Sequence, residues 1–224
     1  MLLKLLARDA ARLVGNAFSG NPLDLPQVKR HTGNWHHDDI DWLALKVRDV
    51  PGDFAEIGVF RGAAFRKVTM LALQQGKIAH AFDSFIGMDE PSPADGTSYP
   101  KGKFDIGGPD EFVRLMTKVG IARELYQIWP GYVPACFASV PESLRFSFVI
   151  LDVDHYQPTV DALRWLPARI SDAGILAIDD YLPHTNSMAS KAIKEFLATD
   201  HGFEKIATFN QQLILRKLPS KTKL

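Results

Sequence analysis

The feature that most constrains the fold is a regular alternation of short apolar runs with longer stretches of helical spacing. Seven apolar runs are typical of β-strands, and they are Asp53 to Phe60, Ile78 to Asp83, Leu125 to Gly131, Phe146 to Asp152, Gly174 to Asp180, Glu204 to Phe209 and Gln212 to Lys217. Strands that alternate with helices predict an α/β fold with right-handed crossovers, a mostly parallel seven-stranded sheet and helices on both faces. The last two runs are joined tightly at Asn210 and Gln211, which predicts a terminal hairpin with one antiparallel strand.

The helical stretches and the chain ends indicate how the domain is organised. Helical periodicity covers five stretches beyond residue 39, and they are Ile40 to Val50, Arg61 to Gly76, Glu111 to Val119, Gln157 to Ile170 and Ala189 to Ala198. Asp110 is the expected N-cap of the third stretch, and Pro167 lies awkwardly inside the fourth. We expect residues 1–50 to form a helical cap or oligomer contact, residues 51–217 the main domain and residues 218–224 a polar tail.

Composition and charge exclude several classes of protein. A chain of 224 residues with 46% hydrophobic and 23% charged residues fits one globular domain. Its 26 basic residues equal its 26 acidic ones, which argues against a nucleic-acid binder that acts through bulk charge. Cys136 is the only cysteine, so no intrachain disulfide can form; we expect a reducing, cytoplasmic compartment and a buried thiol without a catalytic role.

The N-terminal segment is amphipathic and is not a targeting signal. No apolar run approaches the ~20 residues that a membrane-spanning helix needs. Arg8, Asp9 and Arg12 interrupt the apolar stretch that a signal peptide would require. The helical spacing of the apolar residues among these charges favours a docking helix or an oligomer contact, so we expect a homodimer or a higher homo-oligomer.

Acidic residues follow the predicted strands at the points where the strands end. Asp152 and Asp154 follow the fourth strand, and Asp179 and Asp180 follow the fifth. Ligands of open α/β sheets bind at the carboxyl ends of the strands, and the first, fourth and fifth strands are neighbours in this topology. Convergent carboxylates repel one another, so they suit a hard cation such as Mg²⁺, with Mn²⁺ or Ca²⁺ as alternatives. A simpler alternative is that these acids cap helices or bind loop amides.

The first strand ends in a glycine-containing turn, "EIGVFRG", from Glu56 to Gly62. Gly58 and Gly62 lie where the backbone would approach a ligand and where a helix begins. The spacing differs from the GxGxxG dinucleotide fingerprint, and a tight turn without a ligand is the alternative. Asp83, at the end of the second strand, can accept hydrogen bonds from both hydroxyls of a ribose.

Four segments together resemble a known family. "GDFAEIGVFRG", "AFDSFIGMDEP", "FVILDVDHYQPTVDAL" and "GILAIDDY" are similar in order and spacing to the macrocin O-methyltransferase family. Its members are class I S-adenosylmethionine-dependent enzymes of Rossmann-like fold that use a metal and methylate sugar hydroxyls of natural products. The similarity covers roughly residues 51–209, and it implies S-adenosylmethionine and Mg²⁺, or another divalent cation, as cofactors and a small hydroxylated acceptor, a sugar, as substrate.

The resemblance also implies roles for individual residues. Glu56, Gly58 and Val59 would line the methionine end of the cofactor, Asp83 would hold the ribose, and Ser84 and Phe85 would lie near the adenosine. The matching metal ligands are Asp152, Asp179 and Asp180, and Asp154 matches the general base.

A mechanism and two rival functions follow from these assignments. A divalent ion bound to the acceptor oxygen lowers the pKa of the hydroxyl, and Asp154 takes its proton. The long loop from Gly87 to Gly108 closes over both reactants, while His155 and His184 are secondary acid–base candidates. The alternatives are a nucleotide-sugar or phosphoryl transferase with a metal-bound D-x-D, and a methyltransferase-like subunit that only binds partners.

Overall fold

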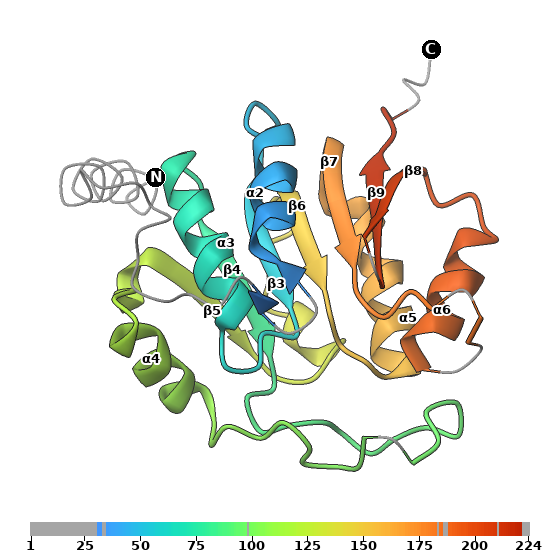
Figure 1. The fold of residues 1–224 in the computed structure, drawn as a ribbon, viewed down its shortest axis with the longest axis horizontal. Helices are drawn as coiled ribbons and strands as arrows, with labels where there is room; N and C mark the ends of the chain where they lie inside the picture. The colour runs from blue at the N-terminus through green and yellow to red at the C-terminus, as the bar shows by residue number, and fades with distance from the viewer. Residues whose placement is uncertain are drawn as a thin grey trace.

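A seven-stranded sheet forms the centre of the molecule, with the strand order β5-β4-β3-β6-β7-β9-β8 (Figure 1). The computed structural model describes residues 31–32, 35–97, 99–182, 184–185, 188–209 and 211–220. The strands of the sheet are β3 (Asp53–Ile57), β4 (Ala79–Asp83), β5 (Tyr126–Pro130), β6 (Phe146–Leu151), β7 (Ile170–Ile178), β8 (Phe203–Phe209) and β9 (Gln212–Lys217). A separate pair of two-residue strands, β1 (His31–Thr32) and β2 (Trp35–His36), precedes them.

The helices cover both faces of the sheet, as the alternation predicts. They are α2 (His37–Lys46), α3 (Ala63–Gln74), α4 (Pro109–Lys118), α5 (Tyr156–Trp165) and α6 (Met188–Leu197), with short 3₁₀ turns η2 (Arg123–Leu125), η3 (Ala135–Phe137) and η4 (Leu166–Ala168). One apolar core joins α2, α3 and α4 to one face, and a second core joins α5 and α6 to the other. The predicted fold class is therefore confirmed.

Strand β6 shows why the sequence forms a sheet that is buried on both faces. All six of its residues are buried. Phe148 and Ile150 pack into the core beneath α2 to α4, whereas Val149 and Leu151 pack into the core beneath α5 and α6. Because successive side chains of a strand point to opposite faces, a continuous apolar run is what two covered faces require.

The topology brings the predicted strand ends together. Strand β6 lies between β3 and β7 and pairs in parallel with both of them, so the first, fourth and fifth strands are neighbours as predicted. The chain runs outward from β3 to β4 and β5, and then reverses to β6 and β7 on the other side of β3. The crevice at the carboxyl ends of β3 and β6 is thus the topological switch point, where α/β proteins bind ligands. Strand β9 is antiparallel to both β7 and β8, which confirms the terminal hairpin.

Several predicted element boundaries were wrong for identifiable reasons. Strand β3 stops at Ile57, because Gly58 takes a left-handed conformation with φ of +87°. Gly108 is the N-cap of α4, and the expected cap Asp110 lies within the first turn instead. Helix α5 ends at Trp165, and Pro167 occupies the early positions of η4, where its missing N–H costs nothing.

The predicted amphipathic helix of residues 1–18 lies outside the described residues, as does most of the predicted cap over residues 1–50. Within the part of the chain that the structure describes, no helix has the length and apolarity to cross a membrane. The loop between β4 and α4 runs beneath the carboxyl ends of the strands in the view of Figure 1.

Candidate active site

A cavity of about 620 Å³ lies at the carboxyl ends of β3, β4, β6 and β7. Of the predicted site residues, seven line it, and they are Gly58, Asp83, Ser84, Asp152, Asp154, Asp179 and Asp180. The other four do not line the cavity, and they are Glu56, Val59, Gly62 and Phe85. The size is within the range of pockets that bind cofactors and small ligands.

Gly58 allows two neighbouring strand ends to meet. A Cβ at this position would lie 1.8 Å from the carbonyl oxygen of Asp152, and the residue has φ of +87°. No side chain fits in that space, because real Cβ atoms do not approach other heavy atoms so closely. Gly58 therefore brings the first strand against the carboxylate-bearing end of β6 and leaves one edge of the cavity formed by backbone.

Gly62 and Phe85 form part of the packing behind the cavity. Gly62 is the N-cap of α3 with φ of +76°, and a Cβ there would lie 2.9 Å from both Met116 and Phe112 of α4. Phe85 is buried, and its ring lies 4.8 Å from that of Phe112. The aromatic side chain that the resemblance places near an adenosine thus lies in the core in this structure.

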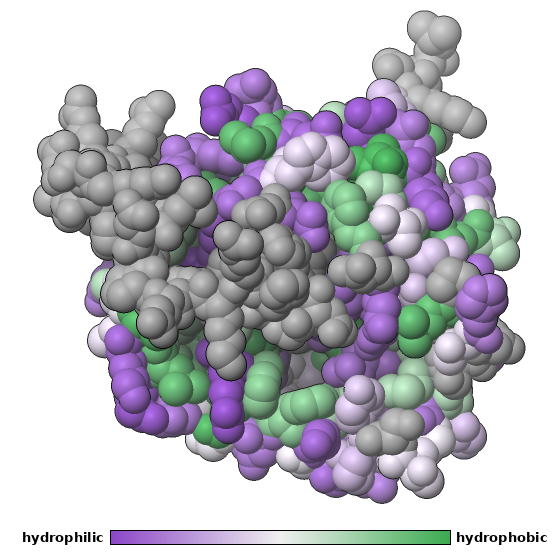
Figure 2. Space-filling view, viewed as in Figure 1, coloured by the Kyte–Doolittle hydropathy of each residue, from purple (hydrophilic) through white to green (hydrophobic). Residues whose placement is uncertain are grey.

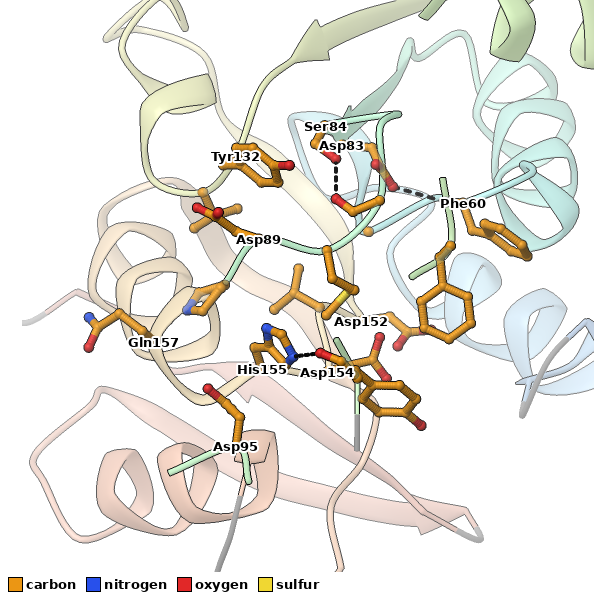
Figure 3. Close-up of a pocket in the computed structure, with 18 of the residues that line it drawn as sticks. Phe60, Asp83, Ser84, Asp89, Asp95, Tyr132, Asp152, Asp154, His155 and Gln157 are labelled. Carbon is orange, nitrogen blue, oxygen red and sulfur yellow. Dashed lines mark hydrogen bonds between the residues drawn. The ribbon is translucent and has the colours of Figure 1, made fainter. Parts of the chain in front are cut away.

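Asp83 fastens the glycine turn to the end of β4. Its Oδ2 accepts hydrogen bonds from the backbone N–H groups of Val59 at 2.8 Å and Phe60 at 3.0 Å, and its Oδ1 accepts one from Phe85 at 2.7 Å. Burial raises the pKa of the Asp83 carboxyl, and the backbone donors oppose that rise. Figure 3 shows the bond from Phe60 and, beside it, the Ser84 hydroxyl donating to the carbonyl of Gly87.

Glu56 lies inside β3, behind the cavity, in an environment that disfavours its charge. Its Oε2 is buried and has no hydrogen-bond partner among the described residues. Burial, followed by repulsion from Asp83, raises the pKa of the Glu56 carboxyl well above its ordinary value. The side chain therefore favours its protonated form, or a cation close by.

Three carboxylates converge at the ends of β6 and β7. One oxygen from each of Asp152, Asp154 and Asp180 lies within 4.8 Å of the others. Burial, followed by repulsion from Asp180, raises the pKa of Asp154 to about 7, and burial, followed by repulsion from Asp179, raises the pKa of Asp180. The pKa of Asp152 is raised well above its ordinary value by burial and by its acidic neighbours, first among them Asp179. Oxygen donors in this arrangement fit a hard divalent cation.

Asp179 lies beside this cluster and has a protein partner. Its Oδ1 accepts a hydrogen bond of 2.7 Å from Nε2 of Gln212, the first residue of β9. Both side chains are buried. The structure thus groups Asp154 with Asp152 and Asp180, whereas the resemblance groups Asp179 with them as the metal ligands.

The loop between Gly87 and Gly108 supplies one wall of the cavity. Its lining residues include Met88, Asp89, Asp95, Tyr99 and Phe104. The composition of this segment predicts a functional loop, but no local pattern indicates which of its side chains face the cavity. In the view of Figure 2, green apolar and purple hydrophilic side chains lie side by side along the lower edge, where this loop crosses.

Aromatic rings form the outer part of that wall. Phe60 and Phe104 are 40% and 36% exposed, and their ring centroids are 5.3 Å apart in an edge-on arrangement. Tyr99 lies 5.5 Å from Phe104 on the loop side. Arg61 and Lys103 lie over Phe60 and Phe104, at 5.1 Å and 5.3 Å from the ring centroids. Sequence patterns did not indicate this aromatic edge.

The lining is strongly acidic. Its carboxylates are Asp83, Asp89, Glu90, Asp95, Asp152, Asp154, Asp179 and Asp180. Over the described residues, no lysine or arginine lines the cavity, and His155 is its one basic side chain. Figure 3 shows Asp152 and Asp154 on the opposite side of the pocket from Asp83 and Ser84, so acids surround the space from both ends. Such a field favours ligands that carry positive charge.

The fold is similar to those of solved methyltransferases. The O-methyltransferase NovP superposes with a TM-score of 0.71 at 19% identity, over 97% of this chain and 98% of that one. The calicheamicin methyltransferase CalS11 superposes with a TM-score of 0.69 at 21% identity, over 93% of this chain and 91% of that one; another structure describes CalS11 as a TDP-rhamnose 3'-O-methyltransferase. The chain therefore has a Rossmann-like fold of the kind found in these methyltransferases.

The sequence comparisons narrow this class to a family. The chain matches macrocin O-methyltransferase over residues 21–211 and belongs to that family. A relative from Streptomyces olivaceus, 8-demethyl-8-(2,3-dimethoxy-alpha-L-rhamnosyl)-tetracenomycin-C 4'-O-methyltransferase, is 31% identical over 142 residues. The match covers 59% of this chain and 54% of that relative, so it spans about half of the relative's length.

Proposed function

We propose that this protein transfers a methyl group from S-adenosylmethionine to a hydroxyl of a sugar-bearing small molecule, with Mg²⁺ or another divalent cation bound beside the acceptor. The observation that carries the proposal is one cavity with Asp83 at one end and three convergent carboxylates at the other. Membership of the macrocin O-methyltransferase family supports the same reaction.

The donor end of the cavity lies between β3 and β4. Gly58 and Ser84 line it, and Asp83 holds the backbone of the glycine turn in place. Three of about four lone-pair positions of the Asp83 carboxylate are taken by backbone N–H groups, which leaves room for about one ribose hydroxyl. Glu56, Val59, Gly62 and Phe85 support this end from behind. A donor with a positive sulfonium is compatible with the acidic lining.

The acceptor end of the cavity lies at β6 and β7. We assign Asp152 and Asp180 to the cation, and Asp179, held by Gln212, as their neighbour or a third ligand. Asp154 takes the proton of the acceptor hydroxyl, since its pKa of about 7 suits a base near neutral pH. When bound, the cation lowers the pKa of that hydroxyl and directs its oxygen. The chain itself holds the two reactants in line and excludes water.

The acceptor is a sugar carried on an apolar body without a diphosphate. The relative from Streptomyces olivaceus is named for a rhamnosyl group on tetracenomycin, whereas CalS11 is named for TDP-rhamnose. A diphosphate requires cationic partners, and over the described lining, which carries no lysine or arginine, its direct partner would be the proposed cation, with Arg61 and Lys103 lying over the rings of Phe60 and Phe104. The exposed rings of Phe60 and Phe104 suit an aromatic aglycone instead.

The proposal is tested by thermal melts and a transfer assay. S-adenosylmethionine and S-adenosylhomocysteine should raise the melting temperature, whereas NAD and UDP-sugars should not. Mass spectrometry should then detect a gain of one methyl group on a rhamnoside of an aromatic phenol, in the presence of Mg²⁺, faster than on TDP-rhamnose. A melt shifted by UDP-sugars alone would favour a nucleotide-sugar transferase. A melt shifted by S-adenosylmethionine without transfer to any hydroxylated acceptor would favour a binding subunit.

A further inference from the structure

The long loop beneath the sheet is tied to the turn that bears the catalytic carboxylates. That turn is Asp152 to His155, between β6 and α5, and the loop runs from Gly87 to Gly108. Two hydrogen bonds join the loop to this region, one to the side chain of His155 and one to the backbone N–H of Tyr156. The loop and the carboxylate cluster are therefore parts of one connected structure, although they are far apart in the sequence.

Asp95 makes the first of these bonds and is buried, with 3% of its surface exposed. Its Oδ1 accepts a hydrogen bond of 2.6 Å from the backbone N–H of Tyr156, the first residue of α5. Its Oδ2 accepts bonds from the backbone N–H and the hydroxyl of Ser92, at 2.8 Å and 2.5 Å. The cap residue of α5, His155, makes no side-chain capping bond, so an acid from the loop satisfies the helix N-terminus in its place.

His155 makes the second bond and is also buried, at 2% exposure. Its Nε2 lies 3.0 Å from the carbonyl oxygen of Tyr99 (Figure 3). A carbonyl can only accept, so Nε2 carries the proton and donates it. The loop is held at a third point, where the backbone N–H of Met188 donates to the carbonyl of Ala94 at 3.1 Å.

The turn that the loop holds has a strained backbone. Asp154 has φ of 56°, a left-handed conformation that non-glycine residues rarely adopt. Asp180, its neighbour in the carboxylate cluster, has φ of 58°. Such conformations persist only where surrounding contacts fix them, and at the Asp154 turn the contacts from the loop are those of Asp95 and Tyr99.

We infer that Asp95 is a positioning residue that couples the order of the loop to the geometry of the carboxylate cluster. This inference rests on the proposed function, because the proposed function assigns a cation to the carboxylate cluster. When Asp95 bonds the N-terminus of α5, Asp152 and Asp154 keep the arrangement that brings them near Asp180. By thermodynamic linkage, a cation that favours this arrangement also stabilises the loop in the position where it bonds His155 and Tyr156. Asp95 itself touches neither cation nor acceptor in this assignment.

The test compares Asp95→Ala with Asp110→Ala in the full-length protein. Asp110 is an exposed acid in the first turn of α4 and does not line the cavity, so it matches Asp95 as a helix N-terminal acid. Titration calorimetry with Mn²⁺, without donor or acceptor, should show a dissociation constant about tenfold higher for Asp95→Ala, as for other residues that orient metal ligands. Asp110→Ala should bind Mn²⁺ as the wild type does. Trypsin should also cut Asp95→Ala faster at Lys101 and Lys103, which are exposed on the loop.

A second pair of variants removes the same bond from the other side. Tyr156→Pro deletes the backbone N–H at the first helical position, where proline is tolerated, and His155 before it already has the extended backbone that a following proline needs. Tyr156→Ala keeps the N–H and loses only the side-chain contacts with Glu195 and Lys191. Only the proline variant should weaken Mn²⁺ binding about tenfold and accelerate loop cleavage.

Two outcomes would overturn the inference. Mn²⁺ affinity that is unchanged in both Asp95→Ala and Tyr156→Pro would make the bond a purely structural cap. Equal losses in Tyr156→Ala and Tyr156→Pro would assign the effect to the side chain. Failure of the proposed function itself has another signature, because then the wild-type protein neither binds Mn²⁺ nor methylates any acceptor. Asp95→Asn keeps an oxygen for Tyr156 and should recover part of the Mn²⁺ affinity.

Discussion

The two ends of the cavity use carboxylates in opposite ways. Asp83 at the end of β4 accepts three backbone hydrogen bonds, so its charge is part of how the glycine turn is held. At the ends of β6 and β7, Asp152, Asp154 and Asp180 face one another. Among the described residues, no backbone N–H or cationic side chain donates to the carboxylates of these three, and the N–H groups of Ala189 and Leu182 reach only the main-chain carbonyls of Asp154 and Asp180.

This contrast separates an acid that has backbone partners from acids whose side chains face one another. The backbone donors at Asp83 lower its pKa against the effect of burial, whereas acidic neighbours raise the pKa of Asp152 and of Asp154 further. Repulsion within such a group is relieved by bound protons or by a bound cation, and the proposed function assigns a cation to this cluster. We therefore expect substitutions in the cluster to act on methyl transfer and cation binding, and substitution of Asp83 to act on stability and donor binding.

Loss of one carboxylate of the cluster should have the largest effect on the rate of methyl transfer. We expect Asp152→Ala to lower the rate of methyl transfer about 10³-fold, because a bound cation contributes several kcal/mol to stabilising the reacting oxygen. A chelator should have the same effect on the wild type and little further effect on the variant. Initial rates at saturating donor and acceptor measure this. Asp172→Ala, an exposed acid on β7 outside the cavity lining, is the control and should retain full activity.

Asp154→Asn distinguishes a base from a metal ligand within the same cluster. Loss of a general base should lower kcat about 10²-fold or more and leave KM for the acceptor nearly unchanged. Mn²⁺ affinity should stay close to that of the wild type if Asp154 takes the proton. A tenfold loss of Mn²⁺ affinity would instead make Asp154 a ligand, and the base would have to be sought elsewhere.

At the other end of the cavity, Asp83→Ala should act mainly on stability and on the donor. Three backbone N–H groups lose their acceptor, so we expect the free energy of unfolding to fall by about 1–3 kcal/mol. Urea denaturation measures that change, and calorimetry should show weaker binding of S-adenosylhomocysteine. Mn²⁺ affinity should be unaffected, and a loss there would contradict the division between the two ends.

The sequence predicted the shared edge because that edge follows from topology alone. Alternating strands and helices predict the strand order around the switch point, and the order brings the ends of β3, β4, β6 and β7 together. Acids directly after apolar runs were therefore enough to predict that Asp83, Asp152 and Asp180 line one cavity. No contact between side chains was needed for that prediction.

Contacts between distant segments could not be predicted in the same way. The bond from Tyr156 to Asp95 spans 61 positions and has no local signature. The partner of Asp179, Gln212, comes from the terminal hairpin. Phe85 follows Asp83 in a turn with φ of 60°, and spacing does not indicate whether such a side chain faces the cavity or the core. Gly58 was expected to approach a ligand, but the atom nearest its missing side chain belongs to Asp152.

The smallest predicted effect is a dependence of stability on pH. Both ends of the cavity contribute to it, but Mg²⁺ should change only the contribution of the carboxylate cluster. Burial and repulsion raise the pKa of Asp154 from its ordinary value of 3.8 to about 7, so the folded protein binds more protons than the unfolded chain between those values. The free energy of unfolding of the cation-free protein should therefore fall as the pH rises from about 4 to about 7, and should level off above that. Asp83 adds a slope of the same sign, since its pKa is also raised, but Mg²⁺ should not change that part.

Thermal melts at about pH 5 and about pH 8, with Mg²⁺ or with a chelator, check this dependence. Mg²⁺ should raise the melting temperature more at the higher pH, because protonated carboxylates bind cations poorly. Asp154→Asn should reduce the slope of the chelated protein, and an equal Mg²⁺ effect at both values would show that the cluster is ionised throughout and that its acids do not repel as their proximity implies.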